Sequence, residues 1–284
     1  MLEHSYRFEA FGTPWVVETN TEISVSVKET IQAKLEALDK VYSRFRSDSL
    51  VAKVSEAPGE YKFPDNAITL FDFYKSLYDI TNGKVTPLIG EMISRAGYDA
   101  SYSLQPQAQK PVPTWKDVMV WSGATITTSQ PVTLDVGAAG KGYAVDGIAA
   151  LLDEYFDDYV IDASGDMRHK GIAKNVVGLE HPLEPGKVIG AVEVLNRSLC
   201  ASASNRRAWG DGMHHIFDPD QMAPTDEIIA TWVIADEAMI ADGLATALFF
   251  VDAKKLSLKY DFEYVRMHAN LSVEYSPYFN GKFF

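Results

Sequence analysis

Residues Asp135 to Asp146 form the part of this chain that is richest in residues able to do chemistry. The segment reads D-V-G-A-A-G-K-G-Y-A-V-D, so three glycines and a lysine stand between two acids. Backbone N–H groups and one lysine at the entrance to a helix are a common means of holding phosphate. The spacing matches neither the Rossmann fingerprint nor the Walker pattern. The alternative is a glycine-rich turn between a strand and a helix, with Lys141 on the surface.

An acid and a hydroxyl, Asp242 and Thr246, form a second candidate site. If this stretch is helical, the two side chains lie one turn apart on the same face. Carboxylate and hydroxyl oxygens are hard ligands suited to Mg2+ or Ca2+. The neighbouring residues are apolar, so Asp242 is expected to be buried and to need a partner, which a metal ion could supply. Taken alone, the spacing favours a helix cap or a satisfied buried pair.

A third candidate combines two histidines with an acid in the sequence H-H-I-F-D-P, from His214 to Pro219. Histidine and aspartate together can bind a metal or move protons. Taken alone, these residues favour an ordinary loop with a turn at Asp218 and Pro219.

Helices interleaved with short strands must position these residues. Apolar residues at helical spacing follow a capping box at Ser26 and Glu29, and a helix is expected over 66–81. A hairpin around residues 129–131 delivers the chain to Asp135, and a helix runs from Lys141 to about residue 155. Strands are expected over 6–10, 15–19, 159–163, 188–195 and 228–235, a buried helix over 238–251, and two short strands in the tail. This order predicts an α+β architecture.

The polar, proline-rich segment 100–114 is expected to be a surface loop or a joint. The chain of 284 residues is long enough for one large domain or for two interleaved subdomains that meet near this segment.

Composition excludes several classes of protein. The net charge of -13 argues against a nucleic-acid partner, and the single cysteine, Cys200, excludes an internal disulfide and a cysteine-based zinc site. No apolar run approaches about 20 residues, so no membrane insertion is expected. The N-terminal residues show neither a signal peptide nor a lipid-anchor cysteine, and we expect a cytoplasmic protein.

The order of several motifs resembles that of the ApbE family of FAD:protein FMN transferases. Asp135 to Asp146 matches the family pattern D-x-G-x-x-x-K-G-Y-A-x-D, and residues 241–248 match A-D-x-L-A-T-A-L. Residues 165–171 match G-D-x-R-x-x-G, and residues 215–219 match H-I-x-D-P. Near the N-terminus, residues 11–13 resemble M-G-T, residues 43–49 match S-x-[FY]-x-x-D-S, and residues 81–83 match T-x-G.

The resemblance implies a fold and a set of roles. The fold would be ApbE-like and related to the T-fold, with mixed sheets and helices and the ligand site between subdomains. FMN would pass from FAD to a Thr or Ser hydroxyl of an acceptor protein, with release of AMP. Mg2+ would be held by Asp242, Thr246 and the backbone carbonyl of Ala138. The acceptor hydroxyl also needs a base, and we choose His215 for this role, with Asp242 as the other catalytic residue. FAD would contact Phe11, Phe45, Val85, Thr86, Asp135, Lys141 and His215.

The chain departs from the family pattern near the flavin and the acceptor. Residues 83–87 read G-K-V-T-P where the family has G-x-F-D-P, and residues 218–224 read D-P-D-Q-M-A-P where it has D-P-R-T-G-x-P. Two alternatives therefore stand beside the transferase. One is a Mg2+-dependent hydrolase that splits FAD into FMN and AMP, and the other is a flavin-binding protein without catalysis.

Overall fold

The computed structural model describes residues 2–210, 212–277 and 279–284. The chain divides into two compact units, and each contains several separate segments. Unit 1 comprises residues 1–35, 141–205 and 226–284, and unit 2 comprises residues 36–140 and 206–225. The segment 100–114 lies inside unit 2, and the chain passes from one unit to the other after residues 35, 140, 205 and 225.

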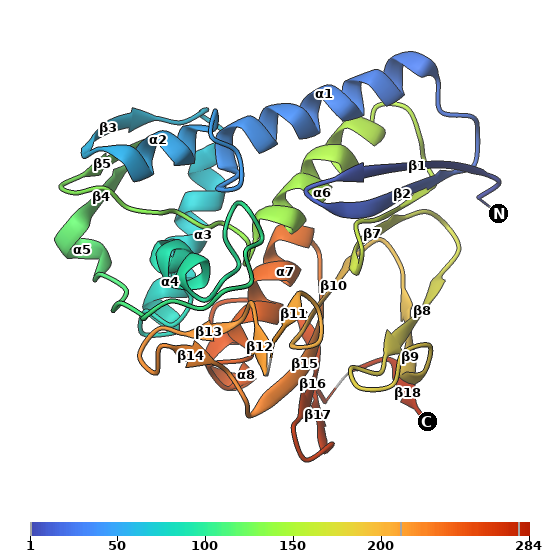
Figure 1. Cartoon of the computed structure of the whole chain (residues 1–284). Coiled ribbons are helices and arrows are strands. Elements are labelled where there is room, and N and C mark those ends of the chain that lie inside the picture. The colour runs from blue at the N-terminus through green and yellow to red at the C-terminus, as the bar shows by residue number, and fades with distance from the viewer. Residues whose placement is uncertain (1, 211, 278) are drawn as a thin grey trace. The chain divides into compact units, whose positions relative to one another are not determined.

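Unit 1 is built on an eight-stranded sheet in which every neighbouring pair is antiparallel. Residues 4–19 form a hairpin at one edge of this sheet, and residues 273–275 form the strand at the other edge (Figure 1). In spatial order the strands are β1 (His4–Ala10), β2 (Thr13–Thr19), β6 (Tyr159–Asp162), β7 (Asp166–Lys170), β10 (Ser198–Ala203), β15 (Ile228–Ala235), β16 (Glu263–His268) and β17 (Val273–Tyr275).

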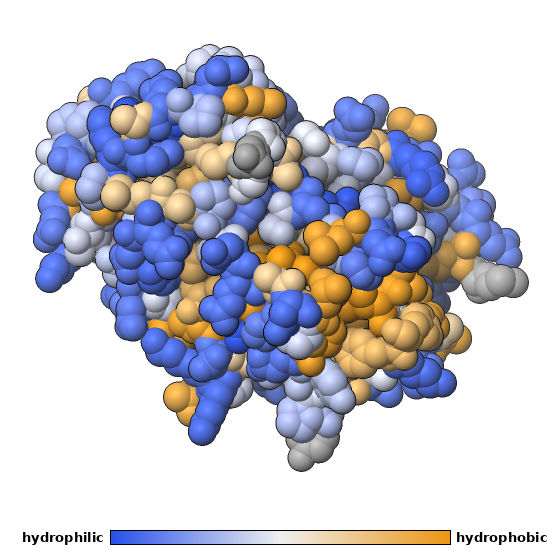
Figure 2. Space-filling model, turned by 60° about the horizontal axis from the view of Figure 1, so that its bottom comes forward, coloured by the Kyte–Doolittle hydropathy of each residue, from blue (hydrophilic) through white to orange (hydrophobic). Residues whose placement is uncertain are grey.

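A smaller sheet of unit 1 packs its apolar side chains against those of the large sheet. Its strands, in spatial order, are β18 (Gly281–Phe283), β9 (Val188–Val194) and β8 (Asn175–Glu180). Leu179 and Val192 from this sheet join Trp232 and Val265 from the large one in a single buried cluster. Unit 1 also exposes apolar side chains, among them Val188 and Phe284, and one face of the molecule carries a continuous apolar area (Figure 2).

Two helices of unit 1, α6 (Gly140–Leu152) and α7 (Ala238–Ala247), follow the sequence pattern. Helix α6 starts within the segment 135–146, and α7 contains Asp242 and Thr246. Small apolar residues occupy nearly every side of α7, which explains why it is buried, packed against β10 and β15. The helix predicted over 238–251 ends earlier than expected, at Ala247. A separate short helix, α8 (Ala253–Leu256), follows it.

Unit 2 combines short helices with a three-stranded sheet. The sheet order is β3 (Gly59–Lys62), β5 (Thr125–Thr128) and β4 (Met119–Ser122). The long helix α1 (Val25–Tyr42) contributes its residues from 36 onward. The other helices are α2 (Leu50–Glu56), α3 (Ala67–Ile80), the 3-10 helix η1 (Pro87–Ile89), α4 (Gly90–Arg95) and α5 (Trp115–Val118), and two small hairpins pair β11 (Ala208–Trp209) with β12 (Met213–His214) and β13 (Phe217–Asp218) with β14 (Ala223–Pro224).

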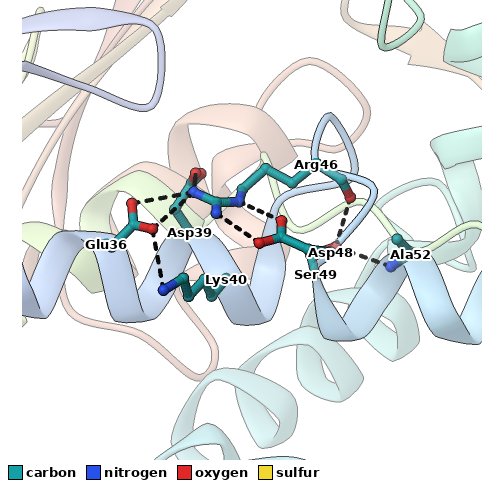
Figure 3. A network of polar contacts seen from close by, with 7 residues as sticks. All are labelled: Glu36, Asp39, Lys40, Arg46, Asp48, Ser49 and Ala52. Atoms are coloured by element: carbon teal, nitrogen blue, oxygen red, sulfur yellow. Dashed lines mark hydrogen bonds and ion pairs between the residues drawn. The ribbon is translucent and has the colours of Figure 1, made fainter.

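A network of charged side chains fixes the connection between α1 and α2 in unit 2 (Figure 3). The Arg46 guanidinium lies 2.8 Å from Asp48 and 3.1 Å from both Asp39 and Glu36. Ser49 caps α2, because its Oγ accepts a hydrogen bond of 3.0 Å from the N–H of Ala52. The segment 43–49, which contains Phe45, is therefore anchored on both sides.

Local predictions fail at three points. Ser26 does not cap α1; the Oγ of Ser24 does so, accepting from the N–H of Val27 at 3.3 Å. The hairpin predicted around residues 129–131 is wrong, because β5 pairs with β4 through a turn at Gly123, which has a φ of +57°. The described residues of the tail, 262–277 and 279–284, form three strands instead of two. In the part of the chain that the structure describes, no helix has the length and apolarity needed to cross a bilayer.

Candidate functional site

Asp242 and Thr246 lie on α7 in unit 1, as the sequence predicts. One helical turn separates them, so both side chains leave the same face. The Asp242 side chain is buried, with 5% of the residue exposed. Its Oδ2 accepts a hydrogen bond of 2.9 Å from the backbone N–H of Gly142 at the start of α6. The carboxylate is therefore oriented by the glycine–lysine segment, by which we mean residues 135–146.

Gly142 allows this contact because it has no side chain. A Cβ at this position would lie 2.2 Å from the carbonyl oxygen of Ala238 and 2.8 Å from the Cβ of Asp242. Such distances are shorter than any van der Waals contact, so α6 and α7 could not approach this closely with alanine at position 142. The glycine directly before the tyrosine of the motif thus serves helix packing.

The Lys141 ammonium makes contacts within unit 1. Its Nζ lies 2.9 Å from Oδ2 of Asp166 and donates to the carbonyl oxygens of Ala163, at 2.9 Å, and Ser164, at 3.4 Å. The Asp166 side chain is 1% exposed, whereas that of Lys141 is 18% exposed. Lys141 therefore neutralises a buried carboxylate and ties the start of α6 to the turn between β6 and β7.

Asp135 lies in unit 2 and is paired with an arginine. Arg44 Nε donates to Oδ2 of Asp135 at 2.5 Å, and the N–H of Gly137 donates to Oδ1 at 2.7 Å. Burial raises the pKa of Asp135, but the nearby Arg44 guanidinium outweighs it and holds the pKa below the ordinary value of 3.8. Ala138 follows in the same loop, and its N–H donates to the Tyr74 hydroxyl at 3.1 Å.

Aromatic rings gather around Phe45 in unit 2. The ring of Phe45 stacks on Tyr102 at 5.5 Å and meets Tyr98 edge to face at 5.3 Å. Tyr98 in turn stacks on Trp209 at 5.6 Å. The Arg44 guanidinium lies 4.2 Å from the centre of the Phe45 ring. This cluster offers aromatic faces next to a cation, which suits a flat heteroaromatic ligand.

The two neighbouring histidines of unit 2 differ in environment. His214 has a structural role, since its Nε2 lies 2.8 Å from the carbonyl oxygen of Thr225 and its Nδ1 accepts from the N–H of Ile216. His215 Nδ1 is buried without a hydrogen-bond partner among the described residues. Burial, helped by the charge of Arg207, lowers the pKa of His215 to about 3, so its imidazole is neutral at pH 7.

Asp218, the acid that follows the histidines, is held by a lysine. Lys84 Nζ lies 2.6 Å from Asp218 and 2.7 Å from Asp220. Burial raises the pKa of Asp218, but its bond to Lys84 and those to the backbone N–H groups of Asp220 and Gln221 keep that pKa below 3.8. Asp218 matches the ApbE pattern, whereas Asp220 stands where that pattern has arginine.

The remaining predicted FAD residues have identifiable local roles. Phe11 sits at the tip of the β1–β2 hairpin with a φ of +52°, and its ring packs against Trp15 at 6.0 Å. Val85 is 3% exposed and Thr86 is 4% exposed. Thr86 caps η1, because its Oγ1 accepts from the N–H of Leu88 at 3.2 Å.

The predicted residues thus fall into one set for each unit. Unit 1 contains Phe11, Lys141, Asp242 and Thr246, and unit 2 contains Phe45, Val85, Thr86, Asp135, Ala138 and His215. Sequence reasoning did not connect these residues with four of their partners, which are Arg44, Tyr98, Gly142 and Asp166. Gly142 and Asp166 stand inside recognised motifs, and this is the signal that the sequence offers. No spacing in the sequence connects Arg44 with Asp135, 91 residues away.

A metal ion at α7 would be bound mainly by oxygen atoms that are not carboxylates. No group of three or more His, Cys, Asp or Glu side chains within residues 2–210, 212–277 and 279–284 is arranged to hold a metal. Asp242 with a threonine hydroxyl and a backbone carbonyl is a set of hard donors that fits Mg2+.

Comparison with known proteins gives consistent matches over most of the chain. The model of the ApbE family matches residues 11–261. The FAD:protein FMN transferase of Haemophilus influenzae is 26% identical over 266 residues, which cover 83% of this chain and 75% of that protein. The protein of the same name from Escherichia coli K12 is 22% identical over 274 residues, which cover 87% and 78%.

Solved structures show the same fold. The ApbE protein of Thermotoga maritima superposes with a TM-score of 0.84 at 21% identity, covering 96% of this chain and 97% of that chain. The flavin transferase ApbE of Vibrio cholerae gives a TM-score of 0.79 at 16% identity, covering 96% of both chains. The predicted α+β, ApbE-like fold is confirmed.

Proposed function

The chain belongs to the ApbE family, and from that membership we propose that it is an FAD:protein FMN transferase, the activity for which its relatives are named. In the proposed reaction, FAD gives up FMN to a Thr or Ser hydroxyl of an acceptor protein, and AMP is released. Because the relatives are only 26% and 22% identical, the proposal depends on the residues present in this chain.

Aromatic and charged residues support the assignment of FAD. The rings around Phe45 supply faces on which an isoalloxazine could stack. Asp135 stays ionised beside Arg44, so it can accept hydrogen bonds from a flavin ring. Lys141 brings positive charge to the glycine–lysine segment, although Asp166 already compensates part of that charge. The full set assigned to FAD is Phe11, Phe45, Val85, Thr86, Asp135, Lys141 and His215.

The Mg2+ ligands are assigned to the Asp242 carboxylate, the Thr246 hydroxyl and the Ala138 carbonyl. All three are hard oxygen donors, and the hydrogen bond from Gly142 orients the Asp242 carboxylate. When bound, Mg2+ would neutralise the pyrophosphate and stabilise the charge that develops as AMP leaves.

The proposed transfer exchanges one phosphorus–oxygen bond for another. The hydroxyl oxygen of the acceptor bonds to the phosphorus of the FMN moiety, and the bond from that phosphorus to the bridging oxygen of the pyrophosphate breaks. The bridging oxygen leaves with AMP and keeps the electron pair. The hydroxyl proton must pass to a base, and neither oxidant nor reductant is needed.

We assign His215 as that base. Its pKa of about 3 keeps the imidazole neutral and able to accept a proton at pH 7. The same low pKa makes it a weak base, so it removes the proton only once the oxygen–phosphorus bond is forming and the hydroxyl has become acidic.

One hydrogen bond carries the proposal. The N–H of Gly142 lies in the segment predicted to meet a pyrophosphate, and it donates to the carboxylate predicted to hold the metal, 100 residues further along the chain. This contact between the two motifs supports the proposal of one site for phosphate and a divalent metal.

The test is incubation of the protein with FAD, Mg2+ and a Thr-containing acceptor protein, followed by analysis of AMP, free FMN and protein-bound FMN. Transfer predicts equal amounts of AMP and of FMN that stays on the acceptor after denaturation. AMP with free FMN, whether or not an acceptor is present, would identify a hydrolase instead. Tight FAD binding without AMP would identify a flavin-binding protein.

Asp242→Ala and Asp252→Ala form a matched pair of variants for this assay. Asp252 is also an acid of unit 1, but its side chain is 88% exposed. The proposal predicts that Asp242→Ala loses Mg2+-dependent AMP release and that Asp252→Ala retains it.

A further inference from the structure

We propose that Asp146, together with Gly142, is a positioning residue that fixes α7 and thereby orients the Asp242 ligand. The inference rests on the proposed function, because that proposal assigns a metal ion to Asp242. All hydrogen bonds from which we argue it lie within unit 1. Helices α6 and α7 lie side by side there (Figure 1).

Asp146 caps α7 from a different helix. Its Oδ1 accepts a hydrogen bond of 2.8 Å from the N–H of Ala238, and its Oδ2 accepts one of 2.8 Å from the N–H of Met239. Glu237, the residue at the N-cap position of α7 itself, makes no side-chain capping bond in the described structure. The first N–H groups of α7 are therefore satisfied by a carboxylate on α6, which also favours the positive end of the helix dipole.

We call the bonds from Ala238 and Met239 to Asp146 the first anchor and the bond from Gly142 to Asp242 the second anchor. The second anchor lies one turn away from the first along both helices. Asp146 and Gly142 are one turn apart on α6, and Ala238 and Asp242 are one turn apart on α7. Asp146 bonds to Ala238, and Gly142 bonds to Asp242. Two such contacts, separated by about 6 Å along each axis, define how far α7 can slide past α6 and how far it can rotate.

The glycine makes the second anchor rigid. Because a Cβ at position 142 would meet the Ala238 carbonyl at 2.2 Å, the two backbones touch without a flexible side chain between them. If α7 slid along α6 by less than one helical turn, the bonds of both anchors would break. The Asp242 carboxylate would then turn away from the Gly142 N–H that orients it. The aspartate that closes the glycine–lysine segment thus acts on the metal through α7, with no need to touch it.

The experiment measures binding of Mn2+ alone to the protein without FAD, from the electron paramagnetic resonance signal of free Mn2+. We expect Asp146→Ala to raise the Mn2+ dissociation constant about tenfold, as is typical when an outer contact of a metal ligand is lost. Asp146→Asn keeps one acceptor oxygen and should show a smaller loss. Asp242→Ala, which removes a ligand, should abolish specific binding.

Ser49→Ala provides the matched control. It also removes a capping hydrogen bond, from Ala52 on α2, and should lower the melting temperature without changing the Mn2+ dissociation constant. If Asp146→Ala lowers the melting temperature but leaves Mn2+ affinity unchanged, as Ser49→Ala does, Asp146 is merely structural and the proposal is overturned. If Asp146→Ala does not fold, the melting temperature and the Mn2+ dissociation constant of Asp146→Asn are compared with those of Ser49→Ala instead.

Failure of the proposed function gives a different result. If the wild-type protein binds Mn2+, and binds it less tightly after Asp146→Ala, but transfers no FMN, the positioning role stands and the transferase assignment falls. If the wild-type protein binds no Mn2+, the positioning role falls as well.

Discussion

Replacing Lys141 by methionine tests how much the ion pair between Lys141 and Asp166 stabilises the protein in the absence of ligand. Methionine keeps most of the length and apolar surface of the lysine stem but removes the charge. Asp166, whose side chain is 1% exposed, then loses the ammonium 2.9 Å away. Neither Asp166 oxygen has another hydrogen-bond partner among the described residues.

The expected cost is large relative to the stability of a typical protein. Removing one partner of a buried ion pair costs about 3–5 kcal/mol, because the remaining charge is left in a medium of low dielectric. Lys141 is 18% exposed, so water can reach the vacated space. We therefore expect a loss close to the lower limit, about 3 kcal/mol, out of a typical total of about 5–15 kcal/mol.

Urea unfolding at pH 7, followed by circular dichroism, measures this loss, and equilibrium dialysis with FAD measures the effect on binding. The double variant Lys141→Met with Asp166→Asn is the control, because it removes both charges. It should recover most of the lost stability, since a neutral amide is far less costly to bury than a carboxylate.

Two results would refute the reasoning. The first is a loss of less than about 1 kcal/mol in Lys141→Met, which is the range of an exposed ion pair. The second is equal stability of the single and double variants. If the double variant is stable but binds FAD as tightly as the wild type, Lys141 has a structural role only and leaves the set assigned to FAD.

Three further predictions concern single groups. Asp242→Asn, which removes the charge but little volume, should lower Mg2+-dependent AMP release at least tenfold; an unchanged rate excludes Asp242 as a ligand. The His215 imidazole should stay neutral down to pH 5, because its pKa is about 3; a nuclear magnetic resonance titration with a midpoint near 6.5 contradicts this. Burial raises the pKa of Asp146 from 3.8 to about 6, so between these pH values the folded chain binds a proton that the unfolded chain lacks. The wild type should therefore gain stability relative to Asp146→Asn as the pH falls from 6.5 to 4.5, and parallel urea-unfolding midpoints would disprove the shift.

Sequence predicts the elements of this fold where periodicity or a motif is strong. The sequence predicts a helix over residues 66–81, and α3 runs from Ala67 to Ile80. Helix α6 begins within the glycine–lysine segment, and α7 places Asp242 and Thr246 on one face. In each case the pattern reflects a burial requirement, which the apolar residues of that helix impose locally.

Other features depend on contacts that no local pattern records. Ser24 and Ser26 are both residues that favour the cap position, and the structure uses Ser24. The sequence predicts a hairpin at residues 129–131, whereas the structure has it at Gly123, because residues at both places favour turns. The pairing of Arg44 with Asp135 and that of Lys84 with Asp218 join residues 91 and 134 positions apart. Such partners emerge only when the fold brings distant loops together.

The order of strands in unit 1 bears on how this protein is synthesised. The sheet starts with residues 4–19 at one edge and cannot be completed until residues 263–275 have been translated at the other. During synthesis β2 must wait for β6, its partner at residues 159–162, and the central strands must wait for β15 and β16, which leave the ribosome near the end of translation. Helix α7 also emerges in this late part of the chain. A nascent chain that stops before residue 242 therefore lacks both proposed side-chain ligands, so premature termination yields a polypeptide without the proposed metal site.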